Sequence, residues 1–238
     1  SRFFMQALSY QNEKLNITEP FKGLFTQGMV CHETYKDENN NWVSPDQITS
    51  INGKKYLKND TKKEIKVGPS ESMSKSKKNT IDPENIINSY GADSARLFIL
   101  SDSPPEKDVQ WSEEGISASY KFIQKLWNLN RIIHEEIKKS YSMDVDDEIK
   151  IFTNRFIKKL SDNLNNFSYN IIVANLHEMY SYMVKNIDRG YKQDTIKENY
   201  RKILTILMPI IPHFSSECLE MIGQTSHSWP DYDQKIIK

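Results

Sequence analysis

The pattern of hydrophobic and polar residues divides the chain into two parts near residue 110. Behind this point, apolar residues recur every three or four positions in four successive stretches, which is the spacing of helices that bury one face. The four sets are Ile116, Tyr120, Ile123, Trp127 and Ile137; Ile149, Phe152, Phe156, Leu160 and Leu164; Ile172, Leu176, Met179 and Met183; and Ile196, Tyr200, Ile203 and Leu207. Amphipathic helices with short polar connections predict an antiparallel bundle, whose last helix Pro209 and Pro212 end or kink.

The part before residue 110 has mixed periodicity. Residues 2–8 read as the middle or end of a helix, and the nearly continuous apolar run 24–31 predicts a buried strand of a parallel sheet. Residues 32–66 are polar and rich in turn signals, which indicates an insertion with short hairpin strands such as 42–43 and 56–57. Two short helices, 83–90 and 92–100, precede a break at Pro104 and Pro105. The predicted fold class is an α/β remnant followed by an all-α antiparallel helical bundle.

Composition narrows the setting. The chain has 238 residues, and its mean hydropathy of −0.67 is that of a polar, water-soluble protein. No apolar run approaches the ~20 residues that cross a bilayer, so no membrane partner and no secretory signal are expected. Two distant cysteines, Cys31 and Cys218, argue against a disulfide or zinc site and favour a cytoplasmic location. Because the chain starts at Ser1 inside a helical pattern, we expect a fragment of a longer protein.

Charge is balanced overall but uneven locally. There are 32 basic and 32 acidic residues, so global charge does not indicate a nucleic-acid-binding protein. Lysines nevertheless crowd two neighbouring segments. For the first segment, a functional basic cluster and an ordinary solvated lysine-rich surface are equally good interpretations. The lysines of the two segments are Lys54, Lys55, Lys58, Lys62, Lys63 and Lys66, and then Lys75, Lys77 and Lys78.

The second lysine segment, residues 72–80, is the strongest candidate for chemistry. It joins a possible hinge at Gly68 and Pro69 to a helix opened by Asp82 and Pro83. Ammonium and hydroxyl groups on a mobile loop before a helix N-terminus suit the binding of a polyphosphate. The alternative is an exposed lysine–serine linker.

Within this loop, Lys75 is the residue expected to stabilise charge on phosphate oxygens. Ser74 and Ser76 are expected to donate hydroxyl hydrogen bonds, and Met73 to anchor the loop on an apolar wall. In the strand 24–31, Gly28 would allow a ligand or backbone to approach closely.

Other polar clusters carry weaker signals. The five histidines show no metal or general-base spacing, so no metal site is predicted from them; they are His32, His134, His177, His213 and His227. The acidic run Asp144, Asp146, Asp147 and Glu148 is typical of a helix N-terminus. Trp127, Phe152 and Phe156 are expected to pack in the core rather than to stack on bases.

Residues 72–76 match the lysine-methionine-serine-lysine-serine signature of class I aminoacyl-tRNA synthetases at four of five positions. Together with residues 26–30, 73–83, 91–98 and 104–115, they resemble the leucyl-tRNA synthetase family. Pro212, His213, Phe214 and Glu217 resemble that family's end-of-bundle motif. The resemblance covers essentially the whole chain.

The resemblance implies a division into domains. Residues 1–110 would be the C-terminal part of a class I Rossmann-type catalytic domain, with the insertion at about 32–66 and the lysine loop at 68–80. Residues 111–238 would be an anticodon-binding-type, tRNA-docking domain. The helix carrying Asp93 and Arg96 would link the two as a structural element.

The resemblance also implies ligands. The intact enzyme would activate leucine with ATP and Mg²⁺ and transfer it to tRNA(Leu), in concert with the remainder of the synthetase chain. Lys75 matches the ATP-binding lysine, and Gly28 and Met29 match a strand near the adenine. Basic residues of the bundle are possible RNA phosphate contacts, although each is more commonly ordinary helix surface; they are Lys121, Lys125, Arg131, Arg155, Lys158 and Lys159.

Two departures from the family pattern matter. Ser72 replaces the first lysine of the signature, so we expect a weaker phosphate clamp, for which Lys77 or Lys78 would partly compensate. No His-Ile-Gly-His-type motif, editing domain or leucine pocket is present, so the isolated fragment is predicted to be inactive. The alternatives are a non-catalytic RNA-binding helical module derived from a synthetase, and an isoleucine- or valine-specific relative.

Overall fold

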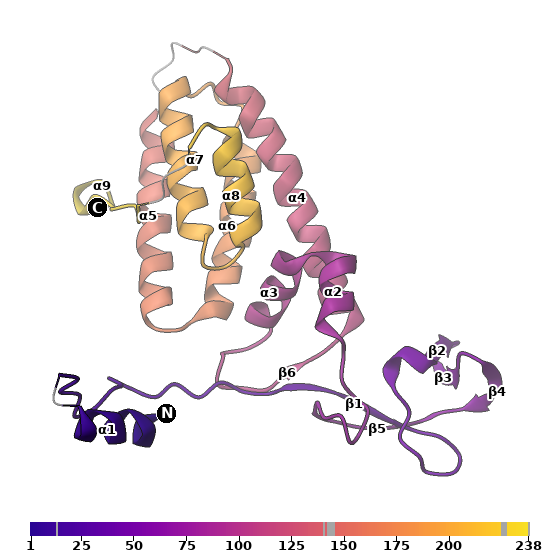
Figure 1. The fold of residues 1–238 in the computed structure, drawn as a ribbon. Helices are drawn as coiled ribbons and strands as arrows, with labels where there is room; N and C mark the ends of the chain where they lie inside the picture. Colours follow the sequence, from indigo (N-terminus) through magenta and orange to yellow (C-terminus); the bar gives the residue numbers. More distant parts are fainter. Residues whose placement is uncertain (13, 140, 142–145, 225–227, 238) are drawn as a thin grey trace.

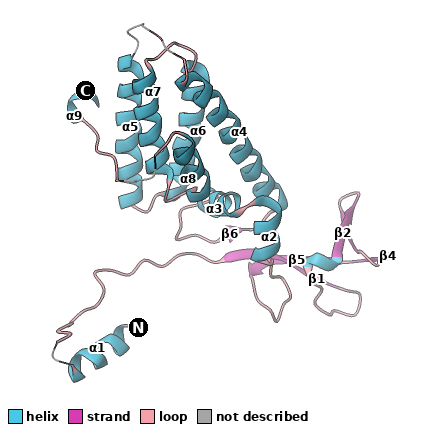
Figure 2. Ribbon diagram, turned by 45° about the horizontal axis from the view of Figure 1, so that its top comes forward, coloured by secondary structure: helices cyan, strands magenta, loops and turns pink. Residues whose placement is uncertain are grey.

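The computed structural model describes residues 1–12, 14–139, 141, 146–224 and 228–237. From the N-terminus, the chain forms one separate helix, a long extended segment, two small sheets and then a helical bundle (Figure 1). Helix α1 (Arg2–Gln11) reaches away from the other elements (Figure 2), and none of its residues is buried. Its Phe3 is 84% exposed and its Tyr10 is 91% exposed.

Long helices stand side by side in the bundle (Figure 1) and confirm the four that the sequence predicts. They are α4 (Glu113–Ile137), α5 (Asp146–Asn165), α6 (Tyr169–Asn186) and α7 (Gln193–Leu207). A fifth helix, α8 (Pro212–Met221), was not predicted separately: the chain breaks after α7, and Pro212 occupies the first turn of a new helix. Side chains such as Ile133, Leu176 and Ile203 are completely buried between these helices.

The buried face of α4 differs from the predicted one. Tyr120 is 37% exposed, whereas Phe122, Leu126 and Leu129 lie in the core. The helix packs against α3 (Ala92–Ser101) as well as α6, α7 and α8, so its apolar residues serve more than one neighbour. Of the three aromatic residues predicted to pack in the core, Phe156 is buried there, whereas Trp127 and Phe152 are partly buried and pack against it.

The first small sheet has three strands in the order β5–β1–β6. Strand β1 (Val30–Lys36) pairs antiparallel with β5 (Lys66–Ser72) and, for two residues, parallel with β6 (Val109–Gln110). The predicted strand 24–31 is therefore wrong in its bounds. Among the described residues no strand lies along residues 24–29, and Leu24 is 90% exposed. Without a paired neighbour, an apolar run does not form a strand.

The second sheet is a hairpin module, β2 (Ile48–Ile51), β3 (Lys54–Leu57) and β4 (Asp60–Glu64), preceded by the 3₁₀ turn η1 (Pro45–Gln47). Asn52 and Gly53 connect β2 to β3 with φ values of 50° and 80°, as a type I′ hairpin turn requires. The expected strand at 56–57 is confirmed as part of β3, whereas at 42–43 only Trp42 pairs, in a single bridge with Lys36. The expected insertion nevertheless starts too early at residue 32, because residues 32–36 continue β1.

Helices α2 (Pro83–Tyr90) and α3 confirm the two short helices that the sequence predicts, and they lie between the sheet and the bundle (Figure 1). Leu97 of α3 belongs to the bundle core, so this helix joins the part before residue 110 to the bundle. Helix α9 (Gln234–Ile237) ends the chain beside α5. Both cysteines are buried and free, and no helix in the described ranges is long and apolar enough to cross a bilayer.

Two charged side chains of α3, Asp93 and Arg96, attach it to the turn between α7 and α8 and to the start of α8. The Asp93 carboxylate accepts hydrogen bonds from the backbone N–H of His213 at 3.3 Å and of Phe214 at 2.6 Å, and lies 2.9 Å from the His213 ring. Arg96 donates to the carbonyls of Pro209 at 2.6 Å and Ile210 at 3.0 Å. Asp93 thus binds the N-terminal donors of α8, whereas Arg96 binds carbonyls of the turn before it.

Candidate functional site

The lysine loop proper comprises residues 73–80, between β5 and α2. The expected bounds 68–80 are too wide, because residues 68–72 belong to β5. Gly68 pairs with Thr34 and Ser70 with Glu33, so Pro69 between them is the extra residue of a bulge in β5. Lys75 and Lys78 form a turn in which Lys78 N–H donates to the Lys75 carbonyl at 3.3 Å. Lys78 has a φ of 53°, so the chain reverses sharply just after the serines.

Lys75 is exposed and lines a groove of about 980 Å³ between the loop, the hairpin module, β1 and the start of α2. We call this the lysine groove. Its charged lining consists of three lysines and three acidic residues: Lys55, Lys58, Lys75, Asp46, Asp82 and Glu113. The Asp82 carboxylate already accepts the Glu84 N–H, which caps α2. The ammonium groups in the groove come from segments up to 20 positions apart in sequence, which folding brings to one place.

The other loop lysines are placed differently. Lys77 forms an ion pair with Glu71 of β5. Ser72, which replaces the expected lysine, pairs in register with Cys31, whereas Glu71 pairs with His32. Successive strand residues face opposite sides of a sheet, so Lys77 lies on the Glu71 side, opposite to the side of Ser72.

The two serines satisfy each other inside the loop. The hydroxyls of Ser74 and Ser76 lie 3.2 Å apart, and the Ser74 hydroxyl accepts the Lys77 N–H at 3.3 Å. Met73 is half-buried, and its N–H donates to the Val30 carbonyl at 3.1 Å. The loop therefore leaves β5 beside Val30, the first residue of β1, and its two serine hydroxyls contact each other.

Gly28 and Met29 do not line the lysine groove. Gly28 N–H donates to the Pro105 carbonyl at 2.8 Å, and Met29 N–H donates to the Asp108 carboxylate at 2.8 Å. A Cβ atom on Gly28 would lie 2.0 Å from the Lys107 carbonyl oxygen, so only glycine fits this approach. Sequence reasoning identified the close approach, but its partner is the backbone of residues 105–108.

Two polar side chains near the loop are buried, which the sequence did not predict. Asn79 is fully buried and hydrogen-bonds to three backbone groups. His32 is 8% exposed, its Nδ1 has no hydrogen-bond partner, and burial lowers the pKa of its ring. No pattern of spacing distinguishes either residue, because their partners are set by how β1 meets β5.

The bundle surface carries the basic residues singled out above. Lys121, Lys125, Arg131 and Arg155 are exposed. Lys158 instead pairs with Asp162 at 2.6 Å, and Lys159 pairs with Glu178 at 2.9 Å. Four of the six residues are therefore the better candidates for contact with a polyanion.

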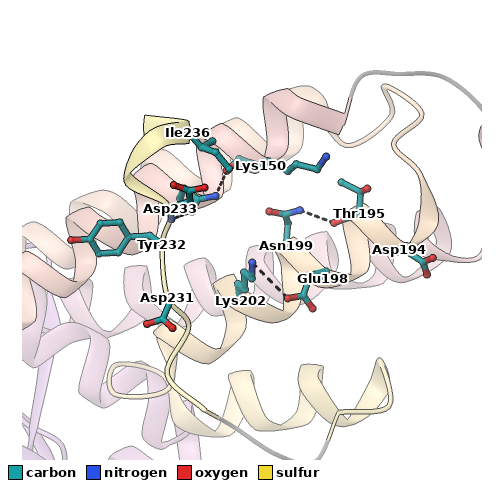
Figure 3. A pocket seen from close by; sticks show the side chains of 11 residues that line it. Lys150, Asp194, Thr195, Glu198, Asn199, Lys202, Asp231, Tyr232, Asp233 and Ile236 are labelled. Carbon is teal, nitrogen blue, oxygen red and sulfur yellow. Dashed lines mark hydrogen bonds and ion pairs between the residues drawn. The ribbon is translucent and has the colours of Figure 1, made fainter. Parts of the chain in front are cut away.

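A pocket of about 580 Å³ between the C-terminal segment, α5 and α7 is lined by more acidic than basic residues, in contrast to these basic positions (Figure 3). Asp233 N–H donates to Asn154 at 2.6 Å and holds the C-terminal segment on α5. Its lining contains four carboxylates against two ammonium groups, which disfavours a phosphate ligand; these are Asp194, Glu198, Asp231 and Asp233 against Lys150 and Lys202.

The remaining polar candidates do not form a site in the structure. Asp147 and Glu148 lie in the first turn of α5, where Glu148 pairs with Arg189. The predictions for Asp144 and His227 lie outside the described residues. Within the described ranges, no group of three or more histidine, cysteine or acidic side chains is arranged to hold a metal ion.

Two sequence families match separate parts of the chain. Residues 65–112 match "tRNA synthetases class I (I, L, M and V)", and residues 146–237 match "Anticodon-binding domain of tRNA ligase". The lysine loop, α2 and α3 fall within the first match, and α5 to α9 within the second.

Known proteins are similar over the whole chain. A leucine–tRNA ligase of Bartonella tribocorum is 37% identical over 258 aligned positions, which cover 100% of this chain and 28% of the relative. A leucine–tRNA ligase of Rickettsia typhi is 40% identical over 225 positions, which cover 94% of this chain and 27% of the relative. The LeuRS–tRNA–LeuAMS complex from Agrobacterium radiobacter superposes with a TM-score of 0.71 at 19% identity, over 100% of this chain and 27% of that one. The chain is thus homologous throughout to leucine–tRNA ligases and spans about 28% of their length.

Proposed function

We propose that this chain, a homologue of one segment of the leucine–tRNA ligases, works as the part of such an enzyme that holds the ATP phosphates and docks the tRNA. The complete enzyme would activate leucine with ATP and Mg²⁺ and then transfer it to tRNA(Leu). The observation that carries this proposal is an exposed Lys75 on the groove side of a loop inside the class I match. The division into 1–110 and 111–238 is part of the proposal, with α3 bridging the two.

In this proposal, Lys75 is the catalytic residue, since its ammonium would contact the phosphates. Departure of pyrophosphate concentrates negative charge on phosphate oxygens, which a positioned cation stabilises without covalent chemistry. Lys75 is exposed at the groove and able to meet such a ligand, whereas Lys77 would first have to leave Glu71. Because position 72 is a serine and not a lysine, Lys75 would contribute most of the binding of the ATP phosphates.

The loop's other residues and the strand before β1 would support this contact. Ser74 and Ser76 would turn their hydroxyls from each other to the phosphates, while Met73 keeps the loop attached beside Val30. Gly28 and Met29 would present backbone to the adenine only if the segment 24–29 gains a neighbouring strand from the remainder of the ligase.

The bundle would bind the body of the tRNA. The A. radiobacter LeuRS that shares its fold was solved with tRNA, and the exposed basic residues Lys121, Lys125, Arg131 and Arg155 offer phosphate contacts. A non-catalytic RNA-binding module is the second candidate function, because the bundle is packed around a large core of its own, whereas the described sheet beside the loop has three strands. Isoleucine or valine specificity is the alternative within the ligases.

The deciding experiment places Lys75→Ala in the complete ligase and measures leucine-dependent ATP–pyrophosphate exchange. We expect the rate of adenylate formation to fall roughly 10²-fold, as when one transition-state contact is removed, with leucine binding unchanged. Lys62→Ala, an exposed lysine on β4, is the control and should leave exchange unchanged. Equal loss of leucine binding and exchange would argue against the phosphate role.

The 238-residue chain alone distinguishes the two functions. We expect no exchange activity from it but salt-dependent binding of tRNA, which weakens in Arg155→Ala. Turnover by the isolated chain would contradict the proposed division of labour. Isoleucine- or valine-dependent exchange by the complete enzyme would instead favour the alternative specificity.

A further inference from the structure

Asn79, at the end of the lysine loop, uses its side chain entirely inside the protein. It is fully buried. Its Nδ2 donates to the carbonyls of His32 at 3.2 Å and Glu71 at 3.1 Å, and its Oδ1 accepts the Ser74 N–H at 2.8 Å. Both amide hydrogens and the amide oxygen are therefore engaged by backbone groups from three different segments.

These three contacts tie the loop to a fixed frame. His32 and Glu71 are register partners across β1 and β5, so the Asn79 amide binds the sheet at one rung of its ladder. The bond to Ser74 closes the loop on itself, because Ser74 and Asn79 flank the turn from Lys75 to Lys78. The turn that carries Lys75 is thereby held at both ends by a single side chain.

Other contacts of the loop are weaker. The Lys77–Glu71 ion pair is more than one-third exposed on both sides, and exposed pairs of this kind contribute little. No residue from 73 to 80 belongs to any of the hydrophobic clusters of the described chain. The order of this segment therefore depends mainly on the buried amide.

We propose that Asn79 is a positioning residue that presets the Lys75 turn at the lysine groove, so that a polyphosphate ligand meets an ordered ammonium group. This inference rests on the proposed function of Lys75. A loop that is already ordered loses less conformational entropy when the ligand binds, and this favours both binding and the transition state. Asn79 itself does not touch the ligand.

Two substitutions separate the parts of this role. Asn79→Ala removes all three hydrogen bonds. Asn79→Asp keeps the shape and the acceptor for Ser74, but its carboxylate cannot donate to the carbonyls of His32 and Glu71. Asn88→Ala, on the exposed side of α2, is the matched control.

The first measurement is limited proteolysis of the 238-residue chain by trypsin, which cuts after lysine. We expect cleavage after Lys75, Lys77 or Lys78 to become at least 10-fold faster in Asn79→Ala and Asn79→Asp, with the melting temperature of the bundle unchanged. Asn88→Ala should be cleaved at the wild-type rate. Unchanged cleavage in both Asn79 variants would overturn the proposal.

The second measurement is ATP–pyrophosphate exchange by the complete ligase. For Asn79→Ala we expect kcat/KM for ATP to fall about 10-fold or more while the KM for leucine stays constant, a split that general destabilisation would not produce. If Lys75→Ala is impaired but Asn79→Ala is normal, the positioning role is wrong. If Lys75→Ala is also normal, the proposed phosphate function fails and the Asn79 proposal fails with it, even where trypsin shows that Asn79 orders the loop.

Discussion

Removing the Asp93 carboxylate should weaken the attachment of α3 to the bundle more than any ordinary surface substitution. Asp93 is 6% exposed and accepts two backbone N–H groups at the start of α8, in addition to its contact with the His213 ring. In Asp93→Ala, these donors lose an ionised acceptor, and the Phe214 N–H is left in a buried environment.

The expected size follows from the contacts. Replacing a capping carboxylate by alanine destabilises by about 0.5–2 kcal/mol. A buried donor left without a partner adds roughly 1–3 kcal/mol. Since these contributions overlap, we expect the free energy of unfolding to fall by about 3 kcal/mol. For a chain of this size that corresponds to a melting temperature lower by roughly 6–12 °C.

The assay is urea unfolding of the 238-residue chain, followed by circular dichroism of the helices. Asp93→Asn retains the shape and one acceptor, so about half the loss is expected, and Asp188→Ala, an exposed aspartate after α6, should stay within about 0.5 kcal/mol of wild type. An Asp93→Ala variant as stable as Asp188→Ala would refute the view that this carboxylate holds α8 on α3.

Two further outcomes test the region around β1. Gly28→Ala should detach the segment before β1 from residues 105–108, because its Cβ would lie 2.0 Å from the Lys107 carbonyl oxygen. We expect faster hydrogen exchange of the backbone amides of residue 28 and Val109, which donate hydrogen bonds across this contact. Unchanged exchange rates of these two amides would contradict the close approach. Burial lowers the pKa of His32 below its ordinary value near 6.5, so the unfolded chain takes up a proton that the folded chain resists. The contribution of His32 to the free energy of unfolding is then fully present above pH 6.5 and is lost as the pH falls below it. The free energy of unfolding should therefore fall less between pH 7.5 and 5.5 in His32→Gln than in the wild type. Equal falls in both proteins would show that His32 does not contribute.

Local chemistry made much of the fold predictable. The start of α2 is specified by Asp82 and Pro83, a side-chain cap followed by a residue with preset φ, and the Asn52-Gly53 turn specifies the hairpin between β2 and β3. The helices α4 to α7 follow from apolar periodicity. Each of these signals lies within a few residues of the element that it determines.

Predictions failed where an element depends on a distant neighbour. The apolar run 24–31 is strand-like, yet only Val30 and Cys31 of this run pair with other strands, β6 and β5. Similarly, Tyr120 fits the helical spacing of α4 but lies on a side that no helix fully covers. A strand or a buried face is a property of two elements together, so one sequence stretch cannot define it.

The candidate site divides in the same way. The loop and its exposed Lys75 were identified from residue types in a short segment. The groove opposite Lys75, the capture of Lys77 by Glu71 and the buried amide of Asn79 were not, since they depend on how β1, β5 and the hairpin module meet.

Neighbouring residues record periodicity, caps and motifs, so the amino-acid sequence predicts the four long helices of the bundle, the hairpin turn, the lysine loop and its family resemblance. Only the tertiary structure decided that Asp93 binds the start of α8, 120 positions away, and that Asn79 fastens the loop to the sheet. The physical reason is that a buried polar group is stable only with a partner, and packing selects that partner from the whole chain.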